Sequence, residues 1–275
     1  MTVKRHWKRA SMTKRSISFD QSTVPQAPIP PPGFEDPTAG DLVLYLDADQ
    51  IDPDVDVSAG NVTTWPDSST FSNNASQTII GARPTYMTAS INGLPTVHFP
   101  VGTFLDLSSI VDIRNNDFTV FAVINHDSTV NTGGPVKYLI STNPGPSPTV
   151  GLVFGGNATG NITNEVITMY HYNGSVVRAA SVTNISIATG PKLYTFGLSG
   201  STEDIAIDDV PQSMTLGGFG GLDGALSESL YFNTVSYSGS SELLGELAVL
   251  LVFNSRLNAA DEDYVYSFMS DKYGI

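Results

Sequence analysis

The chain contains no cysteine among its 275 residues. No disulfide can therefore stabilise the fold, and no thiolate is present to bind a metal or carry out chemistry. Long apolar runs are missing as well, because no segment approaches the roughly 18 residues of a membrane-spanning helix. Ser, Thr, Lys and Arg follow the basic start of the chain, where a secretory signal would need an apolar run. We expect a protein assembled in the cytoplasm, without membrane insertion.

Basic residues are scarce, with 13 Lys and Arg against 27 Asp and Glu, and they are unevenly distributed. Six of the 13 lie in the opening stretch MTVKRHWKRASMTKR. The rest of the chain keeps seven basic and 27 acidic residues, a net charge of about −20. Such a body repels nucleic acid and anionic membranes, whereas the opening stretch is attracted to both.

The composition divides the chain into three parts. Residues 1–19 form a basic anchoring arm, and residues 20–40 (DQSTVPQAPIPPPGFEDPTAG) form a proline-rich linker. Proline favours the extended polyproline geometry, which gives a semi-rigid spacer of about 3 Å per residue. Residues 41–275 then form one domain, since all-β sandwiches often reach this length.

Residues 41–275 show a β pattern. The run FTVFAVI (residues 118–124) is apolar almost throughout, which is typical of a central buried strand. Gly, Pro, Asn and Ser clusters separate the candidate strands at fairly even spacing, which indicates a sandwich or barrel. Further strands are predicted at residues 136–141, 150–154, 166–172, 176–182, 192–197, 204–207 and 247–253.

One helix is predicted near the end of the sequence, over residues 258–274. Asn258 is a suitable N-cap, Asp261 follows three residues later as in a capping box, and Gly274 can end the helix. Its apolar stripe is expected to contain Tyr264, Val265, Phe268 and Met269.

Several segments resemble one family. They are GDLVLYLDAD (residues 40–49), WPDSS (65–69) followed by NNASQ (73–77), ARPTY (82–86), INGLPTVHF (91–99), GELAVLLVFN (245–254) and the ending KYGI (272–275). Together they are similar to the laminin-G-like, concanavalin A-like lectin and glucanase jelly-roll domains found in phage and bacterial surface proteins.

The resemblance covers about residues 40–275. It implies an all-β, concanavalin A-like jelly-roll β-sandwich of two curved antiparallel sheets, with one short C-terminal helix and an extended N-terminal arm. It also implies that the concave face and rim loops bind glycans. It does not by itself fix a function, because functional sites vary on one fold.

Hydrolysis of glycans would need two carboxylates at alternate positions of one strand, so that both face the sugar. Residues 203–209 (EDIAIDD) come closest, but their acids lie at the two ends of an apolar stretch. Residues 261–263 (DED) lie in the first turn of the helix, where capping explains them better. We therefore predict a non-enzymatic protein with no catalytic residues.

Candidate binding residues lie in the loop that begins at Trp65. Trp65 could stack on a sugar or pack in the core, and Asp67, Asn73 and Asn74 could bind a glycan. Oxygen ligands clustered in loops suit Ca²⁺, so calcium is a possible cofactor and no other is expected. The candidate calcium ligands are Asp67, Asn73 and Asp106. In the alternative, these side chains and the run Asp52, Asp54 and Asp56 cap turns.

The arm has three candidate partners: nucleic acid, a membrane surface, or an acidic protein scaffold on which a disordered segment folds. A tail that only improves solubility is the remaining alternative. The residues expected to carry anchoring are Lys4, Arg5, Trp7, Lys8, Arg9, Lys14 and Arg15.

These features together predict a virion protein, a phage capsid decoration or head fibre. Residues 1–40 would attach it to a capsid or other virion protein, and its lectin-like head would contact a host-surface glycan or stabilise the capsid. A homo-oligomer is expected. The alternatives are a carbohydrate-binding module of a bacterial cell-surface system, a tail-fibre receptor-binding protein, and a shell protein with a genome-facing basic arm.

Overall fold

The computed structural model describes residues 41–112, 117–127, 137–141, 150–154, 166–172, 177–183, 190–199, 202–212, 215–216, 231–236, 243 and 245–275. The basic arm and the linker, residues 1–40, lie outside these ranges, so the division at residues 19 and 40 stays a prediction. No helix in the described ranges is long and apolar enough to cross a membrane.

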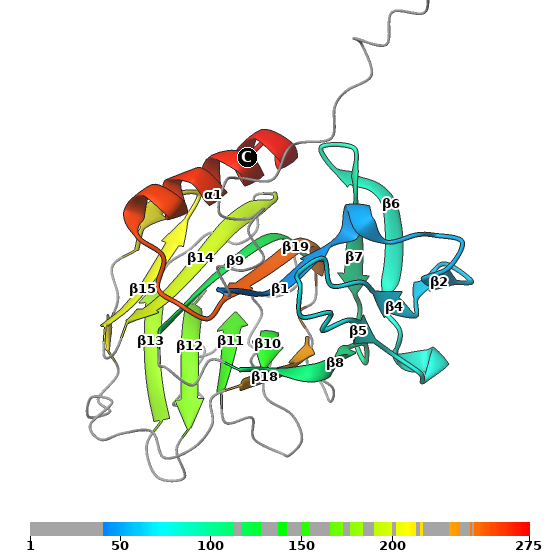
Figure 1. Ribbon diagram of the computed structural model, residues 1–275, viewed down its shortest axis with the longest axis horizontal. Coiled ribbons are helices and arrows are strands. Elements are labelled where there is room, and N and C mark those ends of the chain that lie inside the picture. Colours follow the sequence, from blue (N-terminus) through cyan, green and yellow to red (C-terminus); the bar gives the residue numbers. More distant parts are fainter. Residues whose placement is uncertain are drawn as a thin grey trace, which may run out of the picture.

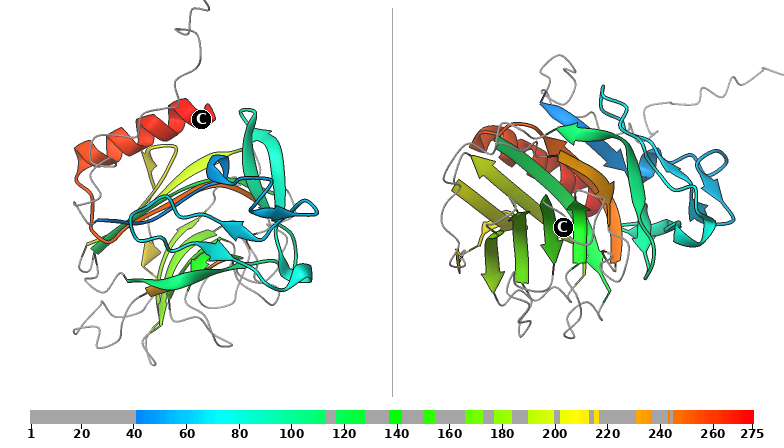
Figure 2. Two further views of the ribbon diagram at one scale, coloured as in Figure 1. Left: turned by 45° about the vertical axis from the view of Figure 1, so that its right-hand side comes forward. Right: turned by 90° about the horizontal axis from the view of Figure 1, so that it is seen from below.

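The protein is built from two antiparallel sheets (Figures 1 and 2). The ten-stranded sheet has the order β16 (Val210–Pro211), β15 (Thr202–Ile207), β14 (Lys192–Ser199), β9 (Asp117–His126), β19 (Gly245–Phe253), β7 (Leu94–Phe99), β6 (Thr85–Ile91), β3 (Asn61–Val62) and β2 (Val57–Ser58), with β1 (Leu42–Asp47) also paired to β19. The nine-stranded sheet has the order β17 (Thr215–Leu216), β13 (Val177–Thr183), β12 (Val166–Tyr172), β11 (Val150–Phe154), β10 (Lys137–Ser141), β18 (Tyr231–Val235), β8 (Leu105–Asp112), β5 (Ala75–Ser76) and β4 (Thr64–Trp65). The predicted all-β sandwich is confirmed.

The ten-stranded sheet is covered on both faces, and this explains its apolar strands. On β9, Val120, Ala122 and Ile124 belong to the core between the two sheets, whereas Phe121 and Val123 belong to a second core beneath the C-terminal helix. Figure 2 shows this helix lying across the face of the sheet that is turned away from the nine-stranded sheet. A strand buried on both sides needs apolar residues at successive positions, and the central buried strand predicted over residues 118–124 is confirmed.

The further strands predicted between residues 136 and 253 are confirmed to within a few residues, whereas β8 and β18 were not predicted. The segments predicted at 150–154 and 166–172 are β11 and β12 with the same bounds. The segments predicted at 204–207 and 247–253 begin two residues earlier, as β15 and β19. Both strands extend beyond the predicted segments because their backbone pairing includes residues that precede the apolar run, namely 202–203 and 245–246.

The helix α1 (Ala259–Tyr273) begins and ends where the sequence predicts. The Asn258 side chain accepts hydrogen bonds from the backbone N–H groups of Ala260 and Asp261, and Gly274 takes the left-handed conformation at φ 69°. The predicted stripe needs one correction, because the side chain of Tyr264 is exposed. The residues that α1 buries are Val265, Met269 and Tyr273.

A buried ion pair joins the end of α1 to the end of β1. Lys272 Nζ lies 2.6 Å from Asp47 Oδ2, and both side chains are almost fully buried. The hydroxyls of Tyr45 and Tyr273 also donate to the Asp47 carboxylate, at 3.1 and 3.2 Å. Burial, followed by the charge of Asp47, raises the pKa of both tyrosines. Two of the segments that carry the family resemblance, near residues 40–49 and 272–275, therefore meet in space.

Candidate functional site

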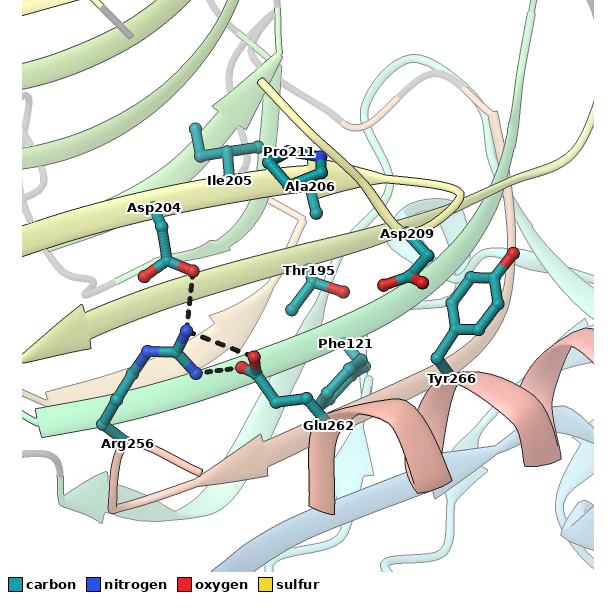
Figure 3. Close-up of a pocket in the computed structure, with 10 residues that line it drawn as sticks. All are labelled: Phe121, Thr195, Asp204, Ile205, Ala206, Asp209, Pro211, Arg256, Glu262 and Tyr266. Atoms are coloured by element: carbon teal, nitrogen blue, oxygen red, sulfur yellow. Dashed lines mark hydrogen bonds and ion pairs between the residues drawn. The ribbon is translucent and has the colours of Figure 1, made fainter. Parts of the chain in front are cut away.

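A pocket of about 340 Å³ lies on the helix-covered side of the ten-stranded sheet, between the β15–β16 hairpin and the first turns of α1 (Figure 3). Strands β9 and β14 supply part of its lining, and the segment that leads into α1 supplies Arg256. The lining residues are Phe121, Thr195, Asp204, Ile205, Ala206, Asp209, Pro211, Arg256, Glu262 and Tyr266.

Arg256 is the centre of an ion-pair network at one end of the pocket (Figure 3). Its Nη2 atom donates to Asp204 Oδ2 at 2.8 Å and to Glu262 Oε2 at 3.2 Å. Its Nη1 atom donates to Glu262 Oε1 and, at 3.1 Å, to the carbonyl oxygen of Leu257. The guanidinium therefore binds Glu262 in the two-bond geometry that matches a carboxylate and links β15 to α1.

Partial burial affects both partners of this network. Burial alone would lower the pKa of Arg256, but hydrogen bonding to Glu262 and the charge of Asp204 raise it overall. Burial raises the pKa of Glu262, whereas the hydrogen bond and charge of Arg256 oppose that rise. Both Glu262 oxygens accept from Arg256, which a protonated carboxyl group could not do equally well. We therefore describe Glu262 as a carboxylate.

Two residues of the ten-stranded sheet position the Arg256 network: Gly197 leaves space for it, and Thr119 holds the segment that carries Arg256. A Cβ atom on Gly197 would lie 2.4 Å from Asp204 Oδ1 and 2.7 Å from Arg256 Nε, so a larger residue would displace the ion pair that crosses β14 here. The Thr119 hydroxyl accepts from Leu257 N at 2.9 Å and donates to the Ser255 carbonyl oxygen at 3.1 Å. Thr119 thereby fixes the segment that carries Arg256.

The acidic residues in this pocket come from the two acidic segments that were considered for hydrolysis and not predicted to be sites. Asp204 and Asp209 come from residues 203–209, and Glu262 comes from residues 261–263. Capping does not explain Glu262, because its side chain binds Arg256. The signal that could have found them is Gly197, since a glycine inside a strand often marks a close approach by another group.

The loop residues predicted to bind a glycan have structural roles. Trp65 is fully buried, so its ring offers no face to a sugar and the core alternative is correct. Asp67 is 8% exposed, and its carboxylate accepts from Tyr45 N, Ser69 N, Ser69 Oγ and Asn73 N at 2.7–2.9 Å. Asn73 donates to the Val43 carbonyl oxygen, and Asn74 accepts from Asp67 N. These contacts tie the loop to β1.

Two of the candidate calcium ligands are adjacent, because Asn73 N donates to Asp67 Oδ2 at 2.7 Å, and calcium binding here stays a prediction. Each Asp67 carboxylate oxygen accepts two hydrogen bonds from the protein, which occupy lone pairs that a cation would need. Asp106 lies on β8 in register with Ser76 and Thr234, and burial raises its pKa. Within the described ranges, no three His, Asp or Glu side chains are grouped closely enough to hold a metal ion. Asp52 and Asp56 accept backbone N–H groups within their own turn, as the capping alternative predicts.

Searches by sequence find no match, either to a protein-family model or to a curated protein. Solved structures do resemble the fold. A sialidase from Trypanosoma rangeli in complex with sialic acid aligns with a TM-score of 0.51 and 14% identity over 85% of this chain. The chain spans only 33% of the length of that sialidase.

Two further structures align over nearly their whole length. Domain 4 of AbnA, a GH43 extracellular arabinanase from Geobacillus stearothermophilus in complex with arabinotriose, has a TM-score of 0.53 and 10% identity over 83% of this chain and 98% of its own. The globular domain of Trypanosoma cruzi calreticulin has a TM-score of 0.50 and 9% identity over 85% of this chain and 93% of its own. The chain has a lectin-like β-sandwich fold, consistent with a jelly-roll domain.

Proposed function

We propose that this chain is a non-enzymatic display protein of a virion surface. Residues 1–40 attach it to an acidic capsid or other virion protein, and the sandwich faces outward, where it binds a host-surface glycan or stabilises the particle. The observation that carries the proposal is the division of charge: six of the 13 basic residues lie in the arm, and the rest of the chain is acidic. Opposite charge attracts such an arm to an acidic partner, and the like charge of neighbouring sandwiches keeps them apart.

The pocket supports a binding function rather than hydrolysis. A glycosidase of the usual type needs one carboxyl group as acid and a second as nucleophile or base. In this pocket Asp204 and Glu262 both bind Arg256, so neither is available for that work without breaking an ion pair.

The test of attachment uses the full chain and purified particles. Replacing the six arm Lys and Arg residues by Gln should abolish incorporation, measured by mass spectrometry, with the sandwich still folded by circular dichroism. The control replaces six uncharged arm residues, Thr2, Ser11, Met12, Thr13, Ser16 and Ser18, by Gln and should be incorporated normally. Normal incorporation of the charge-depleted variant would refute the anchoring role.

A carbohydrate-binding module that works without an assembly is the second candidate. Its support is the likeness to the arabinanase domain, which was solved with arabinotriose and matches the chain over 98% of its own length. This candidate expects glycan binding that does not depend on the arm, and a chain absent from every particle.

A further inference from the structure

The Arg256 network leaves a distinct set of polar groups available in the rest of the pocket. Asp209, Thr195 and Tyr266 line it, and within the described part of the chain their side chains have no hydrogen-bond or ion-pair partner. One is a carboxylate, which only accepts hydrogen bonds, and two are hydroxyls, which accept and donate. Since Arg256 already donates to two carboxylates, the pocket is rich in acceptors and poor in donors.

The β15–β16 turn explains why Asp209 is available. Asp208 and Asp209 form a two-residue hairpin turn with φ 48° and 62°, the left-handed geometry that this turn type requires. Asp208 anchors the turn, because its carboxylate binds Lys192 Nζ at 2.6 Å and Leu193 N at 3.0 Å. Among the residues that the structure describes, Asp209 has no such contact, and it lines the pocket near Thr195 and Tyr266 in Figure 3.

The rest of the lining is apolar and aromatic. The ring of Phe121 and the Tyr266 side chain line the pocket together with Ala206 and Pro211. A volume of about 340 Å³ is near the lower end of the range for small-molecule sites, so it suits one or two rings rather than a long chain. The preferred ligand therefore has many hydrogen-bond donors, an apolar C–H face and little volume.

We propose that this pocket binds a single neutral or amino sugar residue and rejects acidic sugars. Asp209 accepts hydrogen bonds from two neighbouring hydroxyls, the Thr195 hydroxyl contacts a third, and the C–H face of the sugar packs on Tyr266. Three carboxylates against one guanidinium give the pocket a net negative charge, which attracts an amino group and repels a sugar carboxylate. The site lies beside α1, not on the concave face or rim loops that the family resemblance implies. The inference rests on the glycan-binding part of the proposed function.

The test measures binding of methyl glycosides of mannose, galactose, glucosamine and glucuronic acid to the full chain by saturation-transfer NMR and titration. At least one of the first three should bind at least tenfold more tightly than methyl glucuronide. Asp209→Asn should weaken that binding at least tenfold without unfolding the protein, because asparagine tolerates the left-handed turn. Asp263→Asn makes the same charge change on the exposed face of α1, outside the pocket, and should bind like the parent chain.

Two variants of Tyr266 test the contribution of its aromatic ring separately from that of Asp209 in the β15–β16 turn. Tyr266→Phe keeps the aromatic ring and should retain most of the affinity, whereas Tyr266→Ala should lose at least tenfold.

If a glycoside binds but Asp209→Asn and Asp263→Asn behave alike, the pocket assignment is wrong while glycan binding stands. If none of the four glycosides binds, the pocket assignment fails. If a glycan array also shows no binding, the glycan-binding part of the proposed function fails with it. Preferred binding of the glucuronide would overturn the charge argument.

Discussion

A methyl group at residue 197 would collide with the ion pair that crosses β14. Alanine ordinarily suits a strand better than glycine does by about 0.5–1 kcal/mol, but here its Cβ would lie 2.4 Å from Asp204 Oδ1. We expect Gly197→Ala to lower the free energy of unfolding by about 1 to 2 kcal/mol, measured by urea denaturation.

The matched control for that substitution removes the Asp204 carboxylate, with which the new methyl group would collide. In an Asp204→Ala background, Gly197→Ala should cost clearly less, because the nearest contact is gone and only Arg256 Nε remains close. If Gly197→Ala stabilises the parent chain, the ion pair does not depend on glycine at this position.

His126 should make stability depend on pH. Its ring is buried against Tyr194, at 5.7 Å between centroids, and burial lowers its pKa to about 3. The unfolded chain, with an ordinary pKa near 6.5, binds the proton more readily. The stabilisation is therefore complete above pH 6.5 and is lost as pH falls from 6.5 towards 3, at about 1.4 kcal/mol per pH unit.

The comparison variant is His126→Phe, which keeps an aromatic ring and removes the titration. Between pH 7 and pH 5 the parent chain should lose about 2 kcal/mol more unfolding free energy than the variant. If the unfolding free energies of the two proteins changed in parallel with pH, His126 would have the same pKa in the folded and unfolded chains, and the prediction would be wrong.

At the scale of elements, the attachment of α1 depends on the buried Asp47–Lys272 pair. Removing one partner of a buried pair leaves an uncompensated charge, which costs about 3 to 5 kcal/mol. Lys272→Met should therefore destabilise the protein by about that amount in thermal or urea unfolding, and Asp47→Asn in the same chain should restore part of the loss. Lys192→Met breaks the more exposed pair with Asp208 and should cost less than about 1 kcal/mol.

Elements were more predictable from sequence than the pocket was. The apolar run at residues 118–124 and the capping signals at Asn258 and Gly274 are local, so each fixed its element without tertiary information. The pocket instead joins Asp204 to Arg256 and Glu262, which are 52 and 58 residues away, and only the folded sheet brings them together. Trp65 shows the same limit, because a loop pattern does not reveal which side of the loop faces the core.

At the scale of the whole molecule, the proposed attachment and the proposed sugar binding should respond differently to salt. Exposed charges are screened over about 10 Å at 0.1 M salt and about 3 Å at 1 M. Raising NaCl from 0.05 to 1 M should release the chain from particles, while the affinity for a neutral glycoside changes less than threefold. Retention of the chain at 1 M NaCl would mean that contacts other than the arm's charges hold it.

Because β1 pairs with β19, the first strand of the sandwich cannot complete its pairing until nearly the whole chain has been synthesised. Leu42 pairs with Phe253, 211 residues later, and Asp47 pairs with Lys272. At a synthesis rate of roughly 5–20 residues per second, β1 waits roughly 10–40 s for its partner strand. A chain that stops short of residue 245 has no β19 between β9 and β7, so the middle of the ten-stranded sheet stays open. Ribosomes that terminate early would therefore release chains with exposed strand edges, which proteases and chaperones can distinguish from the finished protein.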